Sequence, residues 1–404
     1  MKNLKLKKVL PAVLIPFLLL LSACGKHSSS DALTAPSSIN KGKITSVDHT
    51  WVKRQSIGNC WIYAMATWAE SLHLTATGRK VNISESYWTY WSFYNSLVKG
   101  KFDKDPKKKT KTITTGGTFY VAKKIIQKHG YMLEGDFILS ERNARMSKIQ
   151  KKVEKLINKE IQKGGALHRK SERTPRKVKR FLNKAFGIKA SVFRKKKPAK
   201  QLITGYNQKG EKIGLFQSAK KWKQVTYKMN RFYFYRTKRG KKEILKRVIK
   251  ALNDGKPVIM SVYVEFTAIK KRKMLFSKKE LLKKMKRPRW KGDGGWHMIV
   301  LSDYTMKNIK DGEGGVFNLS EGEYFDGDEL KDLIEDRSLA RDGVLNGKLV
   351  YFVSKNSWGI NRPDRGLTDG YSRFSLDYLN YSNKRVLGDK DTIMLEDFVL
   401  PPGY

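Results

Sequence analysis

Cys60 stands where a polar, glycine-containing turn meets a long apolar segment. The chain reads RQSIGNCW at this point, and the stretch from Trp61 to Leu72 is apolar and compatible with a helix. We therefore expect a helix to begin at Cys60. The unpaired backbone amides and the dipole at a helix N-terminus favour an anion, so the sequence predicts a thiol that ionises more readily than a free cysteine.

A nucleophilic thiolate needs a base, and one histidine has a distinctive setting. His297, in GDGGWHMIVLSDY, opens an apolar strand, which makes it the candidate base for Cys60. The five other histidines lie close to the N-terminus or in ordinary polar or helical surroundings: His27, His49, His73, His129 and His168.

Three blocks, in the order QSIGNCW, GGWHMIVLSDY and KNSWG, resemble the active-site blocks of the papain-like cysteine peptidases, and KNSWG is the most specific. Residues 114–137 resemble the Gly-Gly segment and helix beside that family's substrate cleft. Residues 255–264 resemble the buried strand that opens its second lobe, and residues 366–379 are similar to its closing strand. The resemblance covers the framework of the fold but not the material between these blocks.

The resemblance implies a triad of Cys60, His297 and Asn356. Cys60 would attack a peptide carbonyl, His297 would hold the thiolate as an ion pair and later protonate the leaving amine, and Asn356 would orient the imidazole. Trp358 would shield the hydrogen bond between His297 and Asn356 from water, or it is a plain core tryptophan. The backbone amide of Cys60 and the side chain of Gln55 would form the oxyanion hole.

The chain departs from the family pattern at the oxyanion residue. Gln55 stands five positions before Cys60, where the family has its glutamine six positions before, and Arg54 occupies the sixth. Either the loop is one residue shorter and Gln55 still reaches the site, or the donor has changed; we take Gln55 as the candidate. The cleft residues that the resemblance implies are Gly116, Gly117 and Trp296.

The fold class implied is α+β, a papain-like two-lobe fold with a large basic insertion. A helical lobe with the nucleophile spans residues 51–140, and a β-rich lobe with the His and Asn spans residues 251–404. The basic insertion, residues 141–250, lies between them, because His297 follows Cys60 by about 100 residues more than is usual. Parts of this insertion have apolar residues at helical spacing, which predicts partial folding, whereas residues 194–224 look irregular.

The charge of the chain predicts anionic partners or surroundings. The sequence has 84 Lys and Arg against 37 Asp and Glu, a formal charge of +47, and residues 141–250 hold 37 of the cations against six Glu. The insertion therefore favours attraction to an anionic surface such as lipopolysaccharide, phospholipid or nucleic acid. Nucleic acid is the least favoured, because the chain has no nucleic-acid fold signature. A proteome that is basic throughout would give the same charge without any partner.

The balance of charge reverses inside the β-rich lobe, where acidic residues outnumber basic ones over one segment. An acidic insertion at about 305–348 carries 11 acidic and three basic residues between Asp311 and Asp342. One hypothesis is that it docks against the basic insertion or hangs over the cleft; the other is that it is a solvated loop.

The N-terminus resembles that of an exported bacterial lipoprotein. Residues 1–23 combine a lysine-rich start with an apolar run too short for a good membrane span, and they read as a signal peptide. LSAC resembles a lipobox, which implies lipidation of Cys24; the alternative is an ordinary cleaved signal. Residues 24–50 then form a flexible tether. Gly25 after the anchor favours the outer membrane over the inner membrane.

These features predict a membrane-anchored cysteine peptidase that hydrolyses peptide or protein substrates through a thioester acyl-enzyme. Two alternatives remain: a non-catalytic module for adhesion or for binding an anionic surface, and a thiol hydrolase of peptidoglycan stem peptides. No cofactor or metal is expected, because the chain has no HExxH or paired CxxC motif and two cysteines cannot build a zinc site.

Overall fold

The computed structural model describes residues 47–105, 109–227, 238–310, 315–322, 346–360, 369–388 and 392–404. The predictions for the signal peptide, for Cys24 and for most of the tether lie outside the described residues. Of the acidic insertion at about 305–348, residues 305–310, 315–322 and 346–348 are described, so the prediction that it docks or hangs over the cleft lies mostly outside the described residues. Among the described residues, no helix combines the length and the apolar character needed to cross a membrane.

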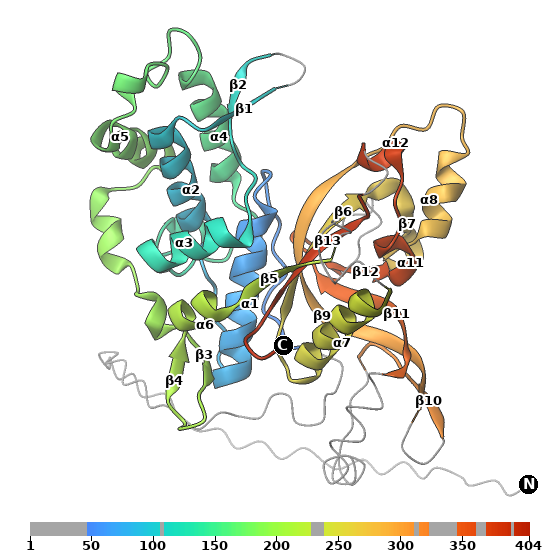
Figure 1. Cartoon of the computed structure of the whole chain (residues 1–404). Helices are drawn as coiled ribbons and strands as arrows, with labels where there is room; N and C mark the ends of the chain where they lie inside the picture. The colour runs from blue at the N-terminus through green and yellow to red at the C-terminus, as the bar shows by residue number, and fades with distance from the viewer. Residues whose placement is uncertain are drawn as a thin grey trace, which may run out of the picture. The chain divides into compact units, whose positions relative to one another are not determined.

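A long helix that begins at Cys60 lies at the centre of the helical lobe. This helix, α1 (Cys60–Thr77), is buried on nearly all sides, and it ends at Gly78, whose φ of 71° is a left-handed conformation that glycine adopts without strain. The helices α2 (Glu85–Lys99) and α3 (Phe119–His129) contact α1. In Figure 1 they lie on the side of α1 opposite the large sheet. The start of α1 therefore agrees with the sequence prediction.

Two amphipathic helices from the predicted basic insertion complete this lobe. They are α4 (Lys148–Glu160) and α5 (Pro175–Phe186). Each buries one apolar stripe in the core cluster that contains α1 and leaves its basic face exposed. The buried side chains are Val153, Ile157, Val178, Leu182 and Phe186.

The remainder of residues 141–250 is divided between the two lobes. Short elements occupy residues 194–224, which the sequence analysis expected to be irregular; they are too short to give a periodic pattern. Of the later elements, α7 (Lys238–Asn253) packs in the core of the β-rich lobe. The short elements are η3 (Ala190–Lys195), η4 (Ala199–Gln201), β3 (Ile203–Tyr206), β4 (Lys212–Gly214), α6 (Leu215–Lys221) and β5 (Lys223–Thr226).

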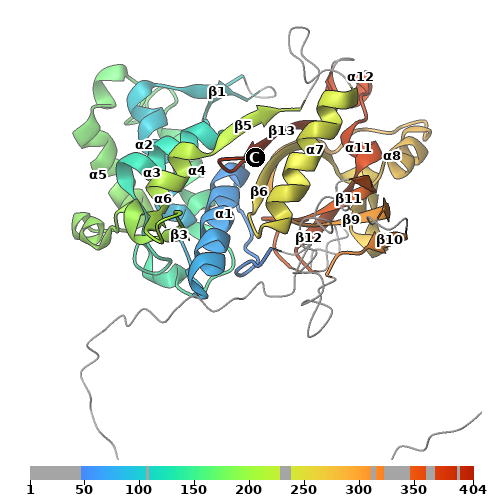
Figure 2. The same ribbon diagram turned by 60° about the horizontal axis from the view of Figure 1, so that its bottom comes forward.

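The β-rich lobe is built on one nine-stranded sheet in the described part of the chain. Its order is β5-β13-β6-β9-β11-β12-β8-β7, and β10 pairs with β9. The helix α7 contacts β6, β9 and β13, and Figure 2 shows it crossing one face of the sheet. The strands not yet bounded are β6 (Val258–Glu265), β7 (Ile269–Lys270), β8 (Leu275–Phe276), β9 (Gly294–Lys310), β10 (Val316–Leu319), β11 (Lys348–Lys355), β12 (Tyr371–Ser375) and β13 (Leu395–Leu400).

The smaller elements are connections within each lobe. A short hairpin of β1 (Phe102–Lys104) and β2 (Lys111–Ile113) follows α2. The rest are η1 (Leu139–Glu141), η2 (Lys170–Glu172), η6 (Phe266–Ala268), η7 (Lys271–Lys273), α8 (Lys278–Met285), α11 (Leu376–Leu379) and α12 (Lys384–Leu387).

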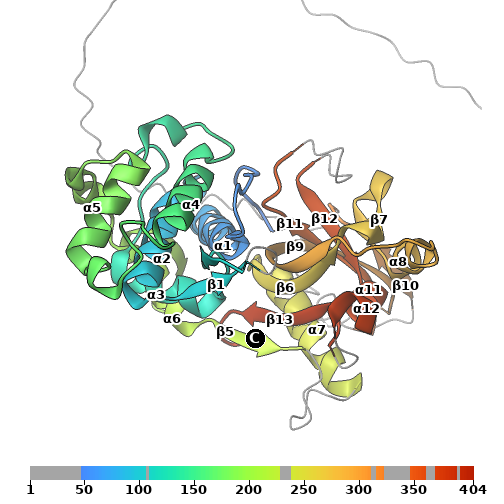
Figure 3. The same ribbon diagram turned by 90° about the horizontal axis from the view of Figure 1, so that it is seen from above.

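The fold class is α+β, with a helical lobe and a β-rich lobe, as the sequence predicted. Buried residues form two core clusters, one mainly helical and one mainly in the sheet. The two meet where α1 packs against β6 and β9, an arrangement that Figure 3 shows from above. Ile259 of β6 and Met298 and Val300 of β9 belong to the helical cluster. This contact brings the start of α1 to the start of β9.

Candidate active site

The loop before Cys60 is held by buried polar contacts. Asn59, which precedes α1, is 1% exposed, and its side-chain amide donates to Thr89 Oγ1 and to Gln150 Oε1, both at 2.9 Å. Gly58 lies so close to Thr115 that a Cβ there would stand 2.7 Å from the threonine hydroxyl oxygen. These contacts fix the backbone that presents the Cys60 thiol.

The thiol of Cys60 lies against the first residues of β9. The backbone amides of Met298, the residue after His297, and of Trp61 donate toward the sulfur. These hydrogen bonds lower the pKa of the thiol, but burial is the larger effect and raises it. The prediction that the helix N-terminus makes this thiol unusually acidic is therefore wrong for the structure as it stands, because desolvation outweighs the amides.

His297 and Asn356 are joined by a hydrogen bond of 2.9 Å between Nε2 and Oδ1. The orientation of the Asn356 amide follows from its other contacts, since Nδ2 donates to Ser372 Oγ at 3.1 Å and Oδ1 accepts from the Ser357 amide at 2.7 Å. Oδ1 is thus an acceptor, and His297 Nε2 must carry the hydrogen. The other ring nitrogen, Nδ1, is left as the base.

Adjacent strands explain how residues 59 positions apart come together. His297 lies near the start of β9, and Asn356 follows the last residue of β11, which pairs antiparallel with β9. The backbone amide of Asn356 also donates to the carbonyl of Gly370 at 3.0 Å. Gly370 directly precedes β12. The residues between β9 and β11 leave this antiparallel pairing intact.

Burial keeps the imidazole of His297 neutral. It lowers the pKa of His297 to about 4, although the hydrogen bond to Asn356 acts in the opposite direction. Burial also raises the pKa of the Cys60 thiol, so both shifts favour the neutral forms of the two groups.

Trp358 lies on the imidazole. The two ring centroids are 4.5 Å apart and the rings are 21° from parallel, so the indole covers one face of His297. The ring of Phe266 packs on the indole with centroids 4.9 Å apart. Trp358 is half-buried, and its contacts fit the shielding position that the resemblance implied.

Gln55 is held beside the segment that follows Asn356. Its backbone amide donates to the Ser357 carbonyl at 2.8 Å, and its Oε1 accepts from Ser357 Oγ at 2.6 Å. Its Nε2 donates one hydrogen bond to the Ile57 carbonyl at 2.9 Å. A primary amide has two N–H groups, and no described residue accepts from the second one.

Two of the three residues predicted to line the cleft, Gly117 and Trp296, lie beside neighbours of Cys60 and His297. The indole of Trp61 donates to the Thr115 carbonyl at 2.8 Å, and a Cβ at Gly117 would stand 2.5 Å from that ring, so this position requires glycine. Gly116 is exposed and open. Trp296 is 46% exposed and packs edge-on against Tyr263. Gly117 thus packs on the residue after Cys60, and Trp296 directly precedes His297.

Sequence reasoning missed a buried charged cluster beneath this site. Lys53 Nζ lies 2.7 Å from Glu85, 3.1 Å from Glu70 and 3.8 Å from Glu134. Burial raises the pKa of Glu134 to about 11, with the neighbouring Glu85 adding to the effect. Burial also lowers the pKa of Lys355, next to Asn356, to about 8. Only the acidic residues inside apolar helices gave any signal of this cluster in the sequence.

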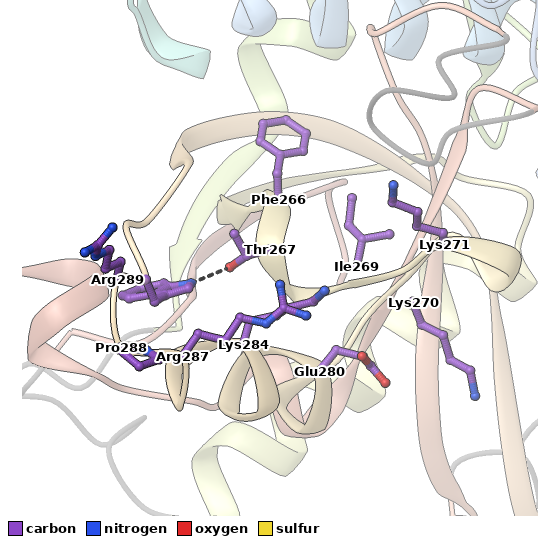
Figure 4. A pocket seen from close by; sticks show the side chains of 11 residues that line it. Phe266, Thr267, Ile269, Lys270, Lys271, Glu280, Lys284, Arg287, Pro288 and Arg289 are labelled. Carbon is purple, nitrogen blue, oxygen red and sulfur yellow. Dashed lines mark hydrogen bonds between the residues drawn. The ribbon is translucent and has the colours of Figure 1, made fainter.

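A large cavity adjoins Phe266. It measures about 940 Å³ and lies between the segment after β6 and the helix α8 (Figure 4). The indole of Trp290 donates to Thr267 Oγ1 at 3.1 Å across one end of it. Most of its charged lining is basic: Lys270, Lys271, Lys284, Arg287 and Arg289, with the one acidic residue Glu280.

No protein-family model matches this chain, and no curated protein matches it. Among solved structures, the chain is similar to one from a study of antibody cross-reactivity between the mite allergens Blo t 1 and Der p 1. The TM-score is 0.34 and the identity 12%, over 93% of this chain and 78% of that one. It is also similar to digestive procathepsin L 3 from the larval midgut of Tenebrio molitor, with a TM-score of 0.34 and 13% identity over 93% and 72% of the two chains. The functional argument therefore rests on the geometry of the site.

Proposed function

We propose that this protein is a papain-like cysteine peptidase with Cys60 as its nucleophile. One observation carries the proposal: His297 is bonded through Nε2 to Asn356 at 2.9 Å, and the next residue of the same strand, Met298, donates its amide to the Cys60 sulfur. A thiol, an oriented imidazole and an orienting amide therefore lie within one small region. This combination supports thiol-dependent acyl transfer.

The neutral resting pair defines the first step. His297 Nδ1 accepts the proton of the Cys60 thiol as the sulfur attacks the substrate carbonyl carbon, and the carbonyl oxygen becomes an oxyanion. The backbone amide of Cys60 and the free N–H of Gln55 donate to that oxyanion. His297 then gives the proton to the leaving amine as the C–N bond breaks, which leaves a thioester on Cys60.

The second half-reaction regenerates the enzyme. His297 Nδ1 takes a proton from water, the resulting hydroxide attacks the thioester, and the product carboxylic acid leaves as the proton returns to the sulfur. Asn356 keeps Nδ1 turned toward the reacting atoms throughout. Trp358 excludes water from one face of the imidazole.

Covalent labelling tests the proposal. A peptidyl epoxide should label the native protein, and Cys60→Ala and His297→Ala should abolish labelling, whereas His168→Ala should leave it intact as a matched histidine control. Absence of labelling in the native, folded protein would refute the peptidase proposal and favour a binding module. Digestion of casein compared with purified sacculi then separates a protein peptidase from a hydrolase of peptidoglycan stem peptides.

We also propose that the protein is lipid-anchored through Cys24 in a bacterial membrane. The lysine-rich start, the apolar run and LSAC support this. Metabolic labelling with a fatty-acid analogue should mark the full chain but not Cys24→Ala, and fractionation of the two membranes tests the preference for the outer membrane. Labelling that persists in Cys24→Ala would contradict the anchor.

A further inference from the structure

A second cavity, which we call the basic cavity, adjoins the proposed oxyanion residue. It measures about 470 Å³, and its walls include Gln55 and Ser56 from the loop before Cys60. Among the described residues, no Asp or Glu lines it. The other lining residues are Met146 and five cations: Arg54, Lys148, Lys151, Lys152 and Lys155.

The four lysines lie on one face of α4. Their spacing of three, four and seven residues puts them in neighbouring turns on the same side of the helix. Like charges at this spacing repel one another, and the first turn of α4 has no acidic residue to offset them or the helix dipole. Such an arrangement of like charges is stabilised when an anion binds in the basic cavity.

The protein itself does little to neutralise these charges. Among the described residues, no carboxylate comes within salt-bridge distance of the five cations. Glu154 of the same helix interacts with Lys151 and Lys155, whose charges lower its pKa, but its burial is the larger effect and raises that pKa. One half-buried carboxylate does not balance five cations.

Two contacts fix the basic cavity to the catalytic loop. The buried Gln150 of α4 accepts from Asn59, the residue before Cys60, and the Arg54 amide donates to the Arg145 carbonyl at 2.6 Å. The lysines of α4 therefore keep a defined position relative to the thiol. A concave site held in this way suits a group on the substrate better than a broad anionic surface.

A further polar group in the cavity wall has no partner. The hydroxyl of Ser56 is buried and makes no hydrogen bond with the described residues. A buried hydroxyl without a partner is costly. Ser56 lies next to Gln55, the proposed oxyanion residue, in the loop before Cys60.

We propose that the basic cavity binds an acidic side chain of the substrate, so that peptides with Asp or Glu close to the scissile bond are preferred. This inference rests on the proposed peptidase function and names its substrate class. The ionised carboxylate of the substrate supplies the anion that the lysine face and Arg54 lack. Charge-assisted hydrogen bonds make such a contact selective for Glu over its neutral isostere Gln.

Paired peptides test the proposal. In a set of fluorogenic peptides with Glu or Gln at each position around the cleaved bond, the native enzyme should cleave the best Glu peptide with a kcat/KM about tenfold higher than its Gln partner. This preference should fall as salt is added. Lys151→Glu/Lys155→Glu should reverse it and favour Lys-containing peptides.

A matched variant and three outcomes decide the result. Arg176→Glu/Arg180→Glu on α5 changes the net charge equally and should leave the preference unchanged. Equal cleavage of Glu and Gln peptides overturns the basic-cavity proposal but not the peptidase. Absence of both cleavage and epoxide labelling overturns the peptidase. Loss of binding to anionic lipid vesicles in Lys151→Glu/Lys155→Glu, without a Glu preference in the native enzyme, would assign the cavity to a membrane surface instead.

Discussion

His297 is buried and Cys60 is partly buried, and desolvation shifts their pKa values in opposite directions. The pKa of the Cys60 thiol is raised and the pKa of the His297 imidazole is lowered to about 4, so each group favours its neutral form. Met298 and the first amides of α1 oppose the shift at sulfur without reversing it. Under the proposed function, these directions favour general-base activation of a neutral thiol over a preformed ion pair.

The pH dependence of catalysis follows from the imidazole. Protonated His297 cannot take the thiol proton, so kcat/KM should fall as pH drops through about 4, the pKa in the free enzyme. Measurement of kcat/KM between pH 3 and 8 with a neutral peptide checks this. A preformed ion pair would instead show thiolate absorbance in the ultraviolet at neutral pH, and that absorbance would be lost in Cys60→Ala.

The imidazole of His297 also makes the free energy of unfolding depend on pH, in a direction that its pKa shift fixes. Its folded pKa lies below the unfolded value of about 6.5, so the unfolded chain binds the proton first as pH falls. The stability contribution of His297 is therefore complete above pH 6.5 and is lost progressively down to about pH 4. Urea unfolding should show that the unfolding free energy of His297→Gln falls less steeply with decreasing pH over this window than that of the native protein. An identical slope against pH would contradict this role of His297.

At the scale of elements, α4 acts on the catalytic loop through one buried side chain. Gln150 accepts from Asn59 and donates to Ser86 Oγ at 2.9 Å, so it links α4, α2 and the residue before Cys60. The helix therefore supports the start of α1 and carries the lysines of the basic cavity on its other face. Both roles come from the sequence range that was predicted to be an insertion.

Removing this link should impair catalysis. Gln150→Met keeps the side-chain volume but leaves buried polar groups without a partner, so it should cost about 1–3 kcal/mol of unfolding free energy. It should also lower kcat more than it raises KM, because the position of the thiol changes. The control Gln162→Met, just beyond the C-terminal end of α4, removes hydrogen bonds to the backbone carbonyls of Lys111 in β2 and Asn158 in α4, and kcat should remain unchanged. Equal effects of the two variants on kcat would refute the positioning role.

On the scale of the whole molecule, buried charges tie distant segments together. Lys53 contacts Glu70 of α1, Glu85 of α2 and Glu134 after α3, and its Nζ also donates to the Ile83 carbonyl at 2.9 Å. The strand-like segment 53–55 then pairs with residues 357–359 of the β-rich lobe through backbone hydrogen bonds. The cluster thereby links the helical core to the segment that carries Asn356.

Loss of the buried cation should be costly. Lys53→Met removes the cation that lies 2.7 Å from Glu85 and 3.1 Å from Glu70, so it should reduce the free energy of unfolding by about 3–5 kcal/mol. The control Lys177→Met breaks the exposed pair with Glu172 and should cost at most about 1 kcal/mol. Urea denaturation of both variants measures the difference, and similar losses would show that the buried cluster is not a main source of stability.

The sequence alone determined the chemistry that was available: the order of Cys60, His297 and Asn356, the helix beginning at Cys60, the apolar strand after His297 and the excess of positive charge. These features depend on residue type and short spacing, which local patterns report. The tertiary structure decided the rest. It brought Met298 to the sulfur, shifted the pKa values of Cys60 and His297 toward their neutral forms, joined α4 to Asn59 and buried Lys53 among carboxyl groups. Burial and long-range hydrogen bonds depend on segments that are far apart in the chain, and no local pattern can reveal which of them will meet.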